Sequence, residues 1–171
     1  MDDVIALIRD VPDFPKPGIV FKDLTPLFGH GAAMQRVSVA LVEPFKDQGI
    51  TAVAGMEARG FIFGSLAARE LGVGFVPLRK PGKLPEQTFG VSYALEYGEA
   101  TLEMHCDALT VNDRVLVIDD LLATGGTAAA SIDLIGRSGA EIAALGFVVE
   151  LDFLKGRSAL EGQHIHSLIH Y

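Results

Sequence analysis

The chain has 171 residues, which is enough for one domain with a substantial core and too few for two. Its formal net charge of −8 argues against nucleic acid or an anionic membrane as a partner, because both select for a basic surface. No apolar run reaches membrane-spanning length, and the N-terminal MDDVIALIRD has acids where a secretory signal would have positive charge. A single cysteine, Cys106, excludes an internal disulfide, so we expect a cytoplasmic protein.

The N-terminal part combines an expected helix with an irregular segment. The apolar residues of 2–11 share one helical face, which predicts an amphipathic helix. Three prolines and a glycine in PDFPKPG, residues 12–18, prevent regular structure, and residues 19–28 are expected to be extended or irregular. A further helix is predicted over about 32–48, with a kink or break at Pro44.

From residue 51 onward, short apolar strands alternate with helices. Strands are predicted at 51–55, 73–80, 115–119 and 141–151, and helices at 61–72 and about 127–137. Continuous apolar strands separated by helices indicate an α/β fold, with a mostly parallel central sheet flanked by helices, in a single domain spanning 1–171. Ligands of such sheets bind at the carboxyl ends of the strands.

Residues 82–105 interrupt this alternation. The stretch 82–90 reads as a loop, and 91–105 as two strands around a turn at 98–99. An antiparallel hairpin is therefore inserted into the parallel pattern. A long loop followed by a hairpin that leaves the sheet edge is a candidate lid.

Residues 115–127, VLVIDDLLATGGT, end in a glycine-rich turn before a helix. Gly125 and Gly126 allow a tight turn that points several N–H groups at one spot, and the helix N-terminus adds partial positive charge. The hydroxyls of Thr124 and Thr127 can donate as well. A phosphate monoester would therefore be held by neutral donors.

Two acids, Asp119 and Asp120, lie just before this turn. They would repel a phosphate, but they can accept hydrogen bonds from a neighbouring diol, and a ribose 5-phosphate offers both groups. The motif is not a P-loop, since no lysine follows the glycines, and G-x-G-x-x-G is absent from the chain. The alternative is a plain strand–turn–helix in which an aspartate caps the helix.

This segment resembles the signature for 5-phosphoribosyl-1-pyrophosphate (PRPP) of the type I phosphoribosyltransferases, in the form that adenine-specific members carry. The resemblance implies that family's fold and a purine-salvage reaction, in which the 5-phosphoribosyl group of PRPP passes to adenine and gives AMP and pyrophosphate. It also implies Mg²⁺, bound mainly through the substrate's pyrophosphate. Relatives that act on 6-oxopurines carry an acid at the position of Ala123, which favours adenine here.

Two alternatives stand beside this interpretation. One is a different base, such as hypoxanthine, guanine or xanthine. The other is a non-catalytic regulator that senses PRPP on the same fold. A regulator of that kind would be expected to carry a basic nucleic-acid-binding face, for which a chain of charge −8 filled by one domain has no room.

GMEARGF, residues 55–61, is similar to the family's pyrophosphate loop. In the family this loop contains a cis peptide bond and grips pyrophosphate through its backbone and an arginine. The resemblance therefore implies a cis bond between Glu57 and Ala58 and a catalytic role for Arg59. The alternative is a strand-to-helix turn with an exposed arginine.

LRKPGKLP, residues 78–85, matches another family stretch. By this resemblance Lys80 and Lys83 neutralise pyrophosphate, while Arg79 reaches the site of a neighbouring subunit, which implies a homodimer. Taken alone, three clustered cations usually form a solvated turn.

YALEYG, residues 93–98, matches the family's lid motif, in which the residue equivalent to Glu96 is the proposed proton handler at the imidazole ring. Period-two alternation places Glu96 on the face of Ser92 and Ala94, where it is the one strong acid. A solvent-facing glutamate is the alternative.

PDFPKPGIVFKDLTP, residues 12–26, matches the family's hood, which here covers about 1–30. The resemblance implies that the backbone of Val20 reads the amino edge of adenine and that Phe21 stacks on the ring. Lys22 stands where many relatives have arginine, and it can donate to the purine, although not bidentately.

HIHSLIHY, residues 164–171, places His164, His166 and His170 on one face of a possible strand. No acid or cysteine joins them locally, so an exposed edge strand is favoured over a metal site.

Overall fold

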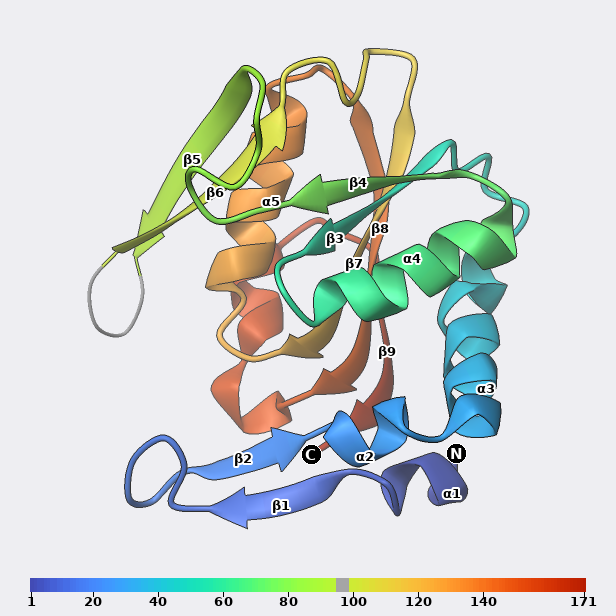
Figure 1. Ribbon diagram of the computed structural model, residues 1–171, viewed down its shortest axis with the longest axis vertical. Coiled ribbons are helices and arrows are strands. Elements are labelled where there is room, and N and C mark those ends of the chain that lie inside the picture. Colours follow the sequence, from blue (N-terminus) through green and yellow to red (C-terminus); the bar gives the residue numbers. More distant parts are fainter. Residues whose placement is uncertain (95–98) are drawn as a thin grey trace.

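The computed structural model describes residues 1–94 and 99–171 and centres on a five-stranded sheet of order β4-β3-β7-β8-β9 (Figure 1). Every neighbouring pair in this sheet is parallel. The strands are β3 (Ala52–Met56), β4 (Gly74–Leu78), β7 (Arg114–Leu122), β8 (Glu141–Glu150) and β9 (Ile165–His170). The predicted mostly parallel α/β sheet is confirmed, and the C-terminal histidine-rich stretch forms its edge strand as expected.

Helices cover both faces of this sheet (Figure 1). The buried side chains of α3 (Gly31–Val42) and α4 (Gly60–Leu71) share one core cluster with Leu116 and Ile118, whereas those of α5 (Gly126–Gly136) share the other with Val115 and Val117. Strand β7 is therefore buried on both sides, which explains its uninterrupted apolar run. Burial of each of these four β7 side chains contributes about 1.5–3 kcal/mol.

The break predicted at Pro44 is confirmed. Helix α3 ends at Val42, and the chain continues as a 3-10 turn, η1 (Glu43–Phe45). Proline is compatible with that turn because it lies in the first positions, where no intrahelical N–H is needed. Other short helices are α2 (Thr25–Phe28), η2 (Asp152–Leu154) and η3 (Gly156–Leu160).

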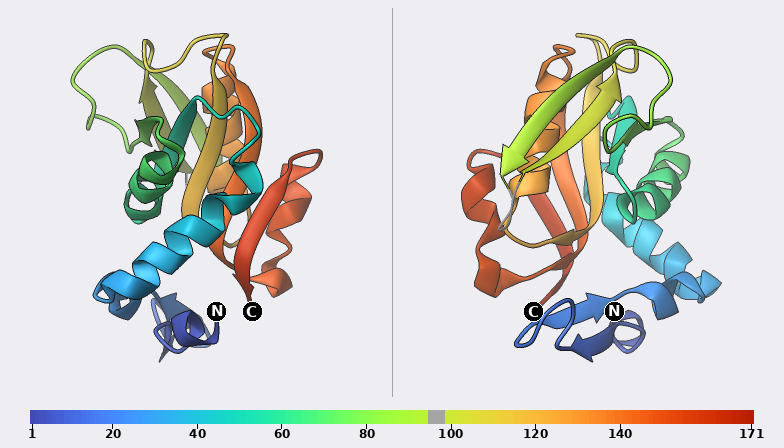
Figure 2. Two further views of the ribbon diagram at one scale, coloured as in Figure 1. Left: turned by 90° about the vertical axis from the view of Figure 1, so that its right-hand side faces the viewer. Right: turned by 60° about the vertical axis from the view of Figure 1, so that its left-hand side comes forward.

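The helix predicted over residues 2–11 is wrong in its second half. Helix α1 covers only Asp2–Ile5, and β1 (Arg9–Pro12) then pairs antiparallel with β2 (Val20–Asp23). Val4 and Ile8 are both buried, as the apolar spacing indicated, but the pairing with β2 supplies backbone partners that override the local helical pattern. In Figure 2 this β1–β2 pair lies beyond the central sheet, near both labelled chain ends.

The hairpin predicted in 91–105 is present and begins earlier. Strands β5 (Thr88–Ala94) and β6 (Glu99–His105) pair antiparallel and pack on the α5 side through Val91, Leu102 and Met104. Residues 95–98, and with them Glu96, lie outside the described residues. Among the described helices, none is both long and apolar enough to cross a bilayer.

Candidate active site

The glycine-rich turn after β7 surrounds a small cavity. Strand β7 runs three residues beyond its predicted end, through both aspartates, and α5 starts at Gly126. Gly125 has a φ of +85°, and a Cβ there would approach Gly156 O to 2.4 Å, so only glycine fits. The cavity encloses about 70 Å³ and is lined by Asp119, Leu121, Leu122, Ala123, Thr124, Gly125, Gly126, Thr127, Ala128 and Phe147.

The two acids of the motif form a buried pair beside this cavity. The N–H of Asp120 donates to Asp119 Oδ1 at 2.9 Å, and Arg59 Nε lies 2.8 Å from Asp120 Oδ2. Burial, and then the neighbouring charge of Asp120, hold the pKa of Asp119 well above its ordinary value. Burial also raises the pKa of Asp120, although the Arg59 guanidinium opposes this shift.

One oxygen of this pair has an ionic partner but no hydrogen-bond donor. Asp120 Oδ2 is buried and has no hydrogen-bond partner among the described residues, because Arg59 lies at ion-pair distance without hydrogen-bond geometry. A buried acceptor without a donor is uncommon in a folded protein, and here the positive charge of Arg59 compensates for the missing hydrogen bond.

The loop after β3 adopts the backbone expected from its resemblance, since the peptide bond between Glu57 and Ala58 is cis. Glu57 Oε2 accepts hydrogen bonds from the N–H of Lys80 at 3.0 Å and from Arg79 Nε at 3.2 Å. The Lys80 N–H is the main reason why the pKa of Glu57 lies below its ordinary value. The Glu57 side chain therefore joins this loop to the cationic loop after β4.

The cationic loop is held mainly through Arg79. Its Nη1 donates to the carbonyl of Lys83 at 3.1 Å, and its backbone pairs with Glu103 of β6. The side chains of Lys80 and Lys83 are exposed beside it. Arg79 thus has partners within its own chain, and its reach to a second subunit stays a prediction.

The hood contacts the acids through Arg59. The Arg59 guanidinium lies 5.2 Å from the centroid of the Phe21 ring, which also packs edge-on against Phe14 at 5.2 Å. Because Arg59 also pairs with Asp120, it stands between the acidic pair and the hood aromatic.

A larger cavity of about 850 Å³ lies between the hood and the glycine-rich turn. Val20 and Lys22 line it from β2, whereas Phe21, between them, faces Arg59, as strand alternation requires. Ala123 and Thr124 line both this cavity and the smaller one, so the two adjoin.

Lys22 contacts two other residues that line the larger cavity, Asp10 and Tyr171. Its ammonium lies 2.7 Å from Asp10 Oδ1 and 3.7 Å from the centroid of the Tyr171 ring. These contacts connect both hood strands to the last residue of the described chain.

Several lining residues were missed by the sequence analysis. Leu151, Phe153 and Leu154 follow the carboxyl end of β8, and Tyr171 follows that of β9. The general rule for parallel sheets pointed to the segment after β8, because its loop opens at the same edge as the glycine-rich turn. No local pattern distinguishes Tyr171.

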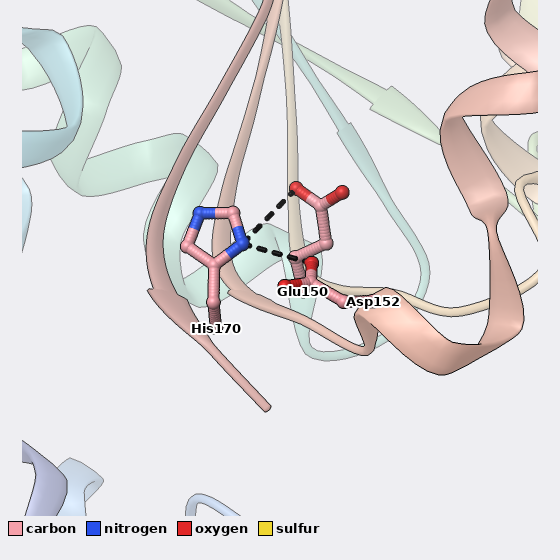
Figure 3. Close-up of side chains that lie close together, drawn as sticks. All are labelled: Glu150, Asp152 and His170. Atoms are coloured by element: carbon pink, nitrogen blue, oxygen red, sulfur yellow. Dashed lines mark hydrogen bonds and ion pairs between the residues drawn. The ribbon is translucent and has the colours of Figure 1, made fainter.

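The three C-terminal histidines separate into two environments. The rings of His164 and His166 pack against Phe45, with centroids 5.5 and 5.9 Å away. His170 Nδ1 instead lies 2.9 Å from Asp152 Oδ1 and 3.9 Å from Glu150 Oε2 (Figure 3). Glu150 ends β8 and Asp152 begins η2, so the local pattern of residues 164–171 did not indicate these acids.

Comparisons with known proteins agree with this geometry. The family model described as a phosphoribosyl transferase domain matches residues 29–163. The adenine phosphoribosyltransferase of Methylococcus capsulatus is 64% identical over 171 residues and is covered, like this chain, over its whole length. The chain belongs to the adenine phosphoribosyltransferase family.

Solved structures of this family share the fold. The adenine phosphoribosyltransferase of Rhodothermus marinus superposes with a TM-score of 0.94 at 50% identity, covering 99% of this chain and 97% of the other. The Giardia lamblia APRTase, determined in complex with 9-deazaadenine, has a TM-score of 0.94 at 40% identity and the same two coverages. The type I phosphoribosyltransferase fold expected from the motifs is confirmed.

Proposed function

We infer that this member of the adenine phosphoribosyltransferase family transfers the 5-phosphoribosyl group of PRPP to adenine, giving AMP and pyrophosphate in purine salvage. The observation that carries this function is the pair of adjoining cavities that share Ala123 and Thr124. One is small and built on a glycine-rich turn, and the other is large and faces the hood. The Giardia relative with 9-deazaadenine supports a purine as the base.

The smaller cavity is assigned to the ribose 5-phosphate part of PRPP. The backbone N–H groups of residues 124–127, the two threonine hydroxyls and the start of α5 donate to the 5-phosphate. Asp119 and Asp120 accept from the ribose hydroxyls. Their raised pKa values fit this role, because hydroxyl donors favour the charged form that burial disfavours.

The loops after β3 and β4 are assigned to pyrophosphate. The backbone at Glu57 and Ala58 and the side chains of Arg59, Lys80 and Lys83 bind it and stabilise the charge that develops as its bond to the ribose breaks. The donor set fits a Mg²⁺ ion carried mainly by PRPP oxygens, since carboxylate oxygens are hard ligands and the Asp119 carboxylate lines the smaller cavity. When bound, this ion neutralises part of the pyrophosphate charge.

The base end is assigned to the junction of hood and turn. Phe21 stacks on adenine, the backbone of Val20 reads its amino edge, and Ala123 leaves room where an acid would serve a 6-oxopurine. Lys22 positions the hood through its contacts with Asp10 and Tyr171, and it also donates to the purine. Glu96 handles the imidazole proton, an assignment that rests on the motif YALEYG.

The remaining assignments concern the lid and the assembly. The loop and hairpin over about 82–105 close as a lid and exclude water, which would otherwise hydrolyse PRPP. The single domain of 1–171 forms a homodimer in which Arg79 extends toward the neighbouring site.

Pyrophosphate release tests this function. With PRPP and Mg²⁺, we expect release with adenine and much less with guanine, hypoxanthine or xanthine, measured in parallel. An Ala123→Asp variant serves as the specificity control, because the added carboxylate should lower release with adenine while leaving the fold intact. No release with adenine in the unaltered protein would exclude the proposed reaction.

A further inference from the structure

The glycine-rich turn rests directly on a segment that the sequence motifs do not include. A Cβ on Gly156, the first residue of η3, would meet Ala123 O at 2.3 Å, and a Cβ on Gly125 would meet Gly156 O at 2.4 Å. The two backbones therefore touch with no side chain between them. A shift of Gly156 must move the turn that carries the phosphate donors.

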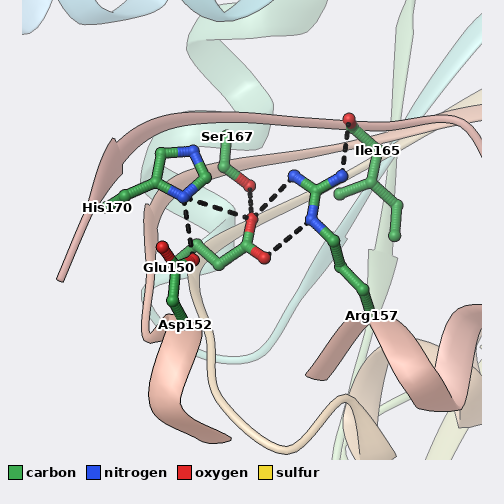
Figure 4. Close-up of polar contacts among 6 residues, drawn as sticks. All are labelled: Glu150, Asp152, Arg157, Ile165, Ser167 and His170. Atoms are coloured by element: carbon green, nitrogen blue, oxygen red, sulfur yellow. Dashed lines mark hydrogen bonds and ion pairs between the residues drawn. The ribbon is translucent and has the colours of Figure 1, made fainter. Parts of the chain in front are cut away.

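The residue after Gly156 is held by a buried carboxylate. Arg157 donates through Nε to Glu150 Oε1 at 2.7 Å and through Nη2 to Glu150 Oε2 at 2.8 Å (Figure 4). Glu150 is only 4% exposed, and Ser167 Oγ donates to its Oε2 at 2.6 Å. A bidentate arginine–carboxylate pair fixes direction as well as distance, so Arg157 and the adjoining Gly156 have little freedom.

Glu150 is also tied to the strand that leads into the turn. It is the last residue of β8 and pairs in register with Leu122, the last residue of β7. The next residue, Leu151, donates its N–H to Leu122 O at 2.9 Å. Glu150 thus links the strand before the glycine-rich turn to the segment beneath it.

A metal site is the competing interpretation of this cluster. Ligand atoms of Glu150, Asp152 and His170 lie within 4.8 Å of one another (Figure 3). However, both carboxylate oxygens of Glu150 already accept from Arg157, whose positive charge opposes a cation at the same place. The geometry therefore favours a structural link over an ion site.

We propose that the Glu150–Arg157 pair is a positioning element for the phosphate end of the PRPP site, which acts by holding Gly156 against residues 123–125. This inference rests on the proposed function, because it takes the turn to be the phosphate site. Neither side chain lines the smaller cavity. Both act through the backbone of the turn.

Loss of the Glu150–Arg157 pair should weaken binding of PRPP and leave binding of adenine nearly unchanged. In Arg157→Ala and Glu150→Gln, we expect the KM for PRPP to rise about tenfold or more, while the KM for adenine changes less than about twofold. Arg157→Lys keeps the charge but loses the bidentate geometry, so its KM for PRPP should lie between those of the unaltered protein and Arg157→Ala. This variant also covers the case in which Glu150→Gln does not fold.

A second arginine–glutamate pair, between β7 and β8, supplies a matched control. Arg114 Nη1 contacts Glu141 Oε1 at the amino ends of β7 and β8, opposite the end that carries Glu150. Arg114→Ala should lower the melting temperature and leave both KM values unchanged. A purely structural role for Arg157 would give this same pattern.

Calorimetry with ribose 5-phosphate tests the positioning role independently of the proposed reaction. We expect its Kd to rise about tenfold in Arg157→Ala, with adenine binding unchanged. Equal losses for both ligands, or a changed melting temperature with unchanged Kd values, would overturn the positioning role. If ribose 5-phosphate binding depends on Arg157 but the unaltered protein releases no pyrophosphate with adenine, the positioning role stands and the proposed reaction fails.

Discussion

The phosphate end and the base end of this site are built in opposite ways. The phosphate end comes almost entirely from one continuous stretch, residues 115–127, which contributes the strand, the acids, the turn and the helix start. The base end is assembled from the hood, the segment 151–154 and Tyr171, which are far apart in the sequence. A substitution at the phosphate end should therefore have a large effect on binding. A substitution at the base end should have a smaller effect, because several contacts contribute to binding there.

The largest effect is expected from Gly125→Ala. The new Cβ would combine a φ of +85° with a 2.4 Å approach to Gly156 O, so the turn must shift and misplace its N–H donors. We expect the KM for PRPP to rise about 100-fold or more, measured by steady-state kinetics, because removing positioned donors for a charged group commonly costs about 10²–10³ in rate.

Gly49→Ala is the control for Gly125→Ala, because it introduces the same kind of backbone strain without a steric clash. Gly49 has a φ of +67°, but a Cβ there would meet nothing within 4 Å. That variant should lose about 1–2 kcal/mol of stability and keep its kinetics. Similar kinetic losses in both variants would show that general strain, rather than the turn, governs PRPP binding.

A smaller effect is expected at the base end from Phe21→Ala. Stacking of a base on an aromatic side chain contributes about 1–3 kcal/mol, so the KM for adenine should rise about tenfold while that for PRPP stays within about twofold. Initial rates at varied adenine and saturating PRPP measure this change.

Phe21→Leu sharpens the interpretation, because it keeps apolar volume between Phe14 and Arg59 but removes the flat ring. If stacking matters, the leucine variant should resemble alanine. Recovery of the adenine KM in the leucine variant would instead assign Phe21 to packing of the hood.

The same contrast explains what was predictable from the sequence. The turn and the strand pattern were predicted because a local stretch of chain determines each of them, whereas the cis bond between Glu57 and Ala58 was implied by the resemblance to the family. The helix predicted to continue past Ile5 failed, because β1 gains its partners from β2, a contact outside the local window. Tyr171 and Gly156 were missed for the same reason, since their roles come from contacts with residues far away in the chain.

The smallest predicted effect concerns stability at the two ends of β7. Asp119 has a raised pKa in the folded protein, so it holds a proton at pH values where the unfolded chain has lost it. Stability therefore falls as pH rises from the unfolded value near 3.8 to the raised folded value, and stays lower above it. Asp119→Asn removes this cost and keeps the acceptor for the Asp120 N–H.

We accordingly expect Asp119→Asn to melt about 2 °C or more above the unaltered protein at neutral pH, with a difference that shrinks toward acid pH.

Asp113, just before β7, has a lowered pKa because of the Thr110 N–H and the hydroxyls of Thr51 and Thr110. Its stabilisation is present above the unfolded pKa and is lost as pH falls through the folded pKa, so Asp113→Asn should melt lower at neutral pH. Scanning fluorimetry from pH 4 to 8 measures both variants, and a lower melting temperature for Asp119→Asn would mean that the acid pair stabilises the fold. A higher melting temperature for Asp119→Asn, together with weaker binding of ribose 5-phosphate, would show that the phosphate end loses stability in order to bind its ligand. The reason is that ribose hydroxyls favour the charged form of Asp119, which burial opposes.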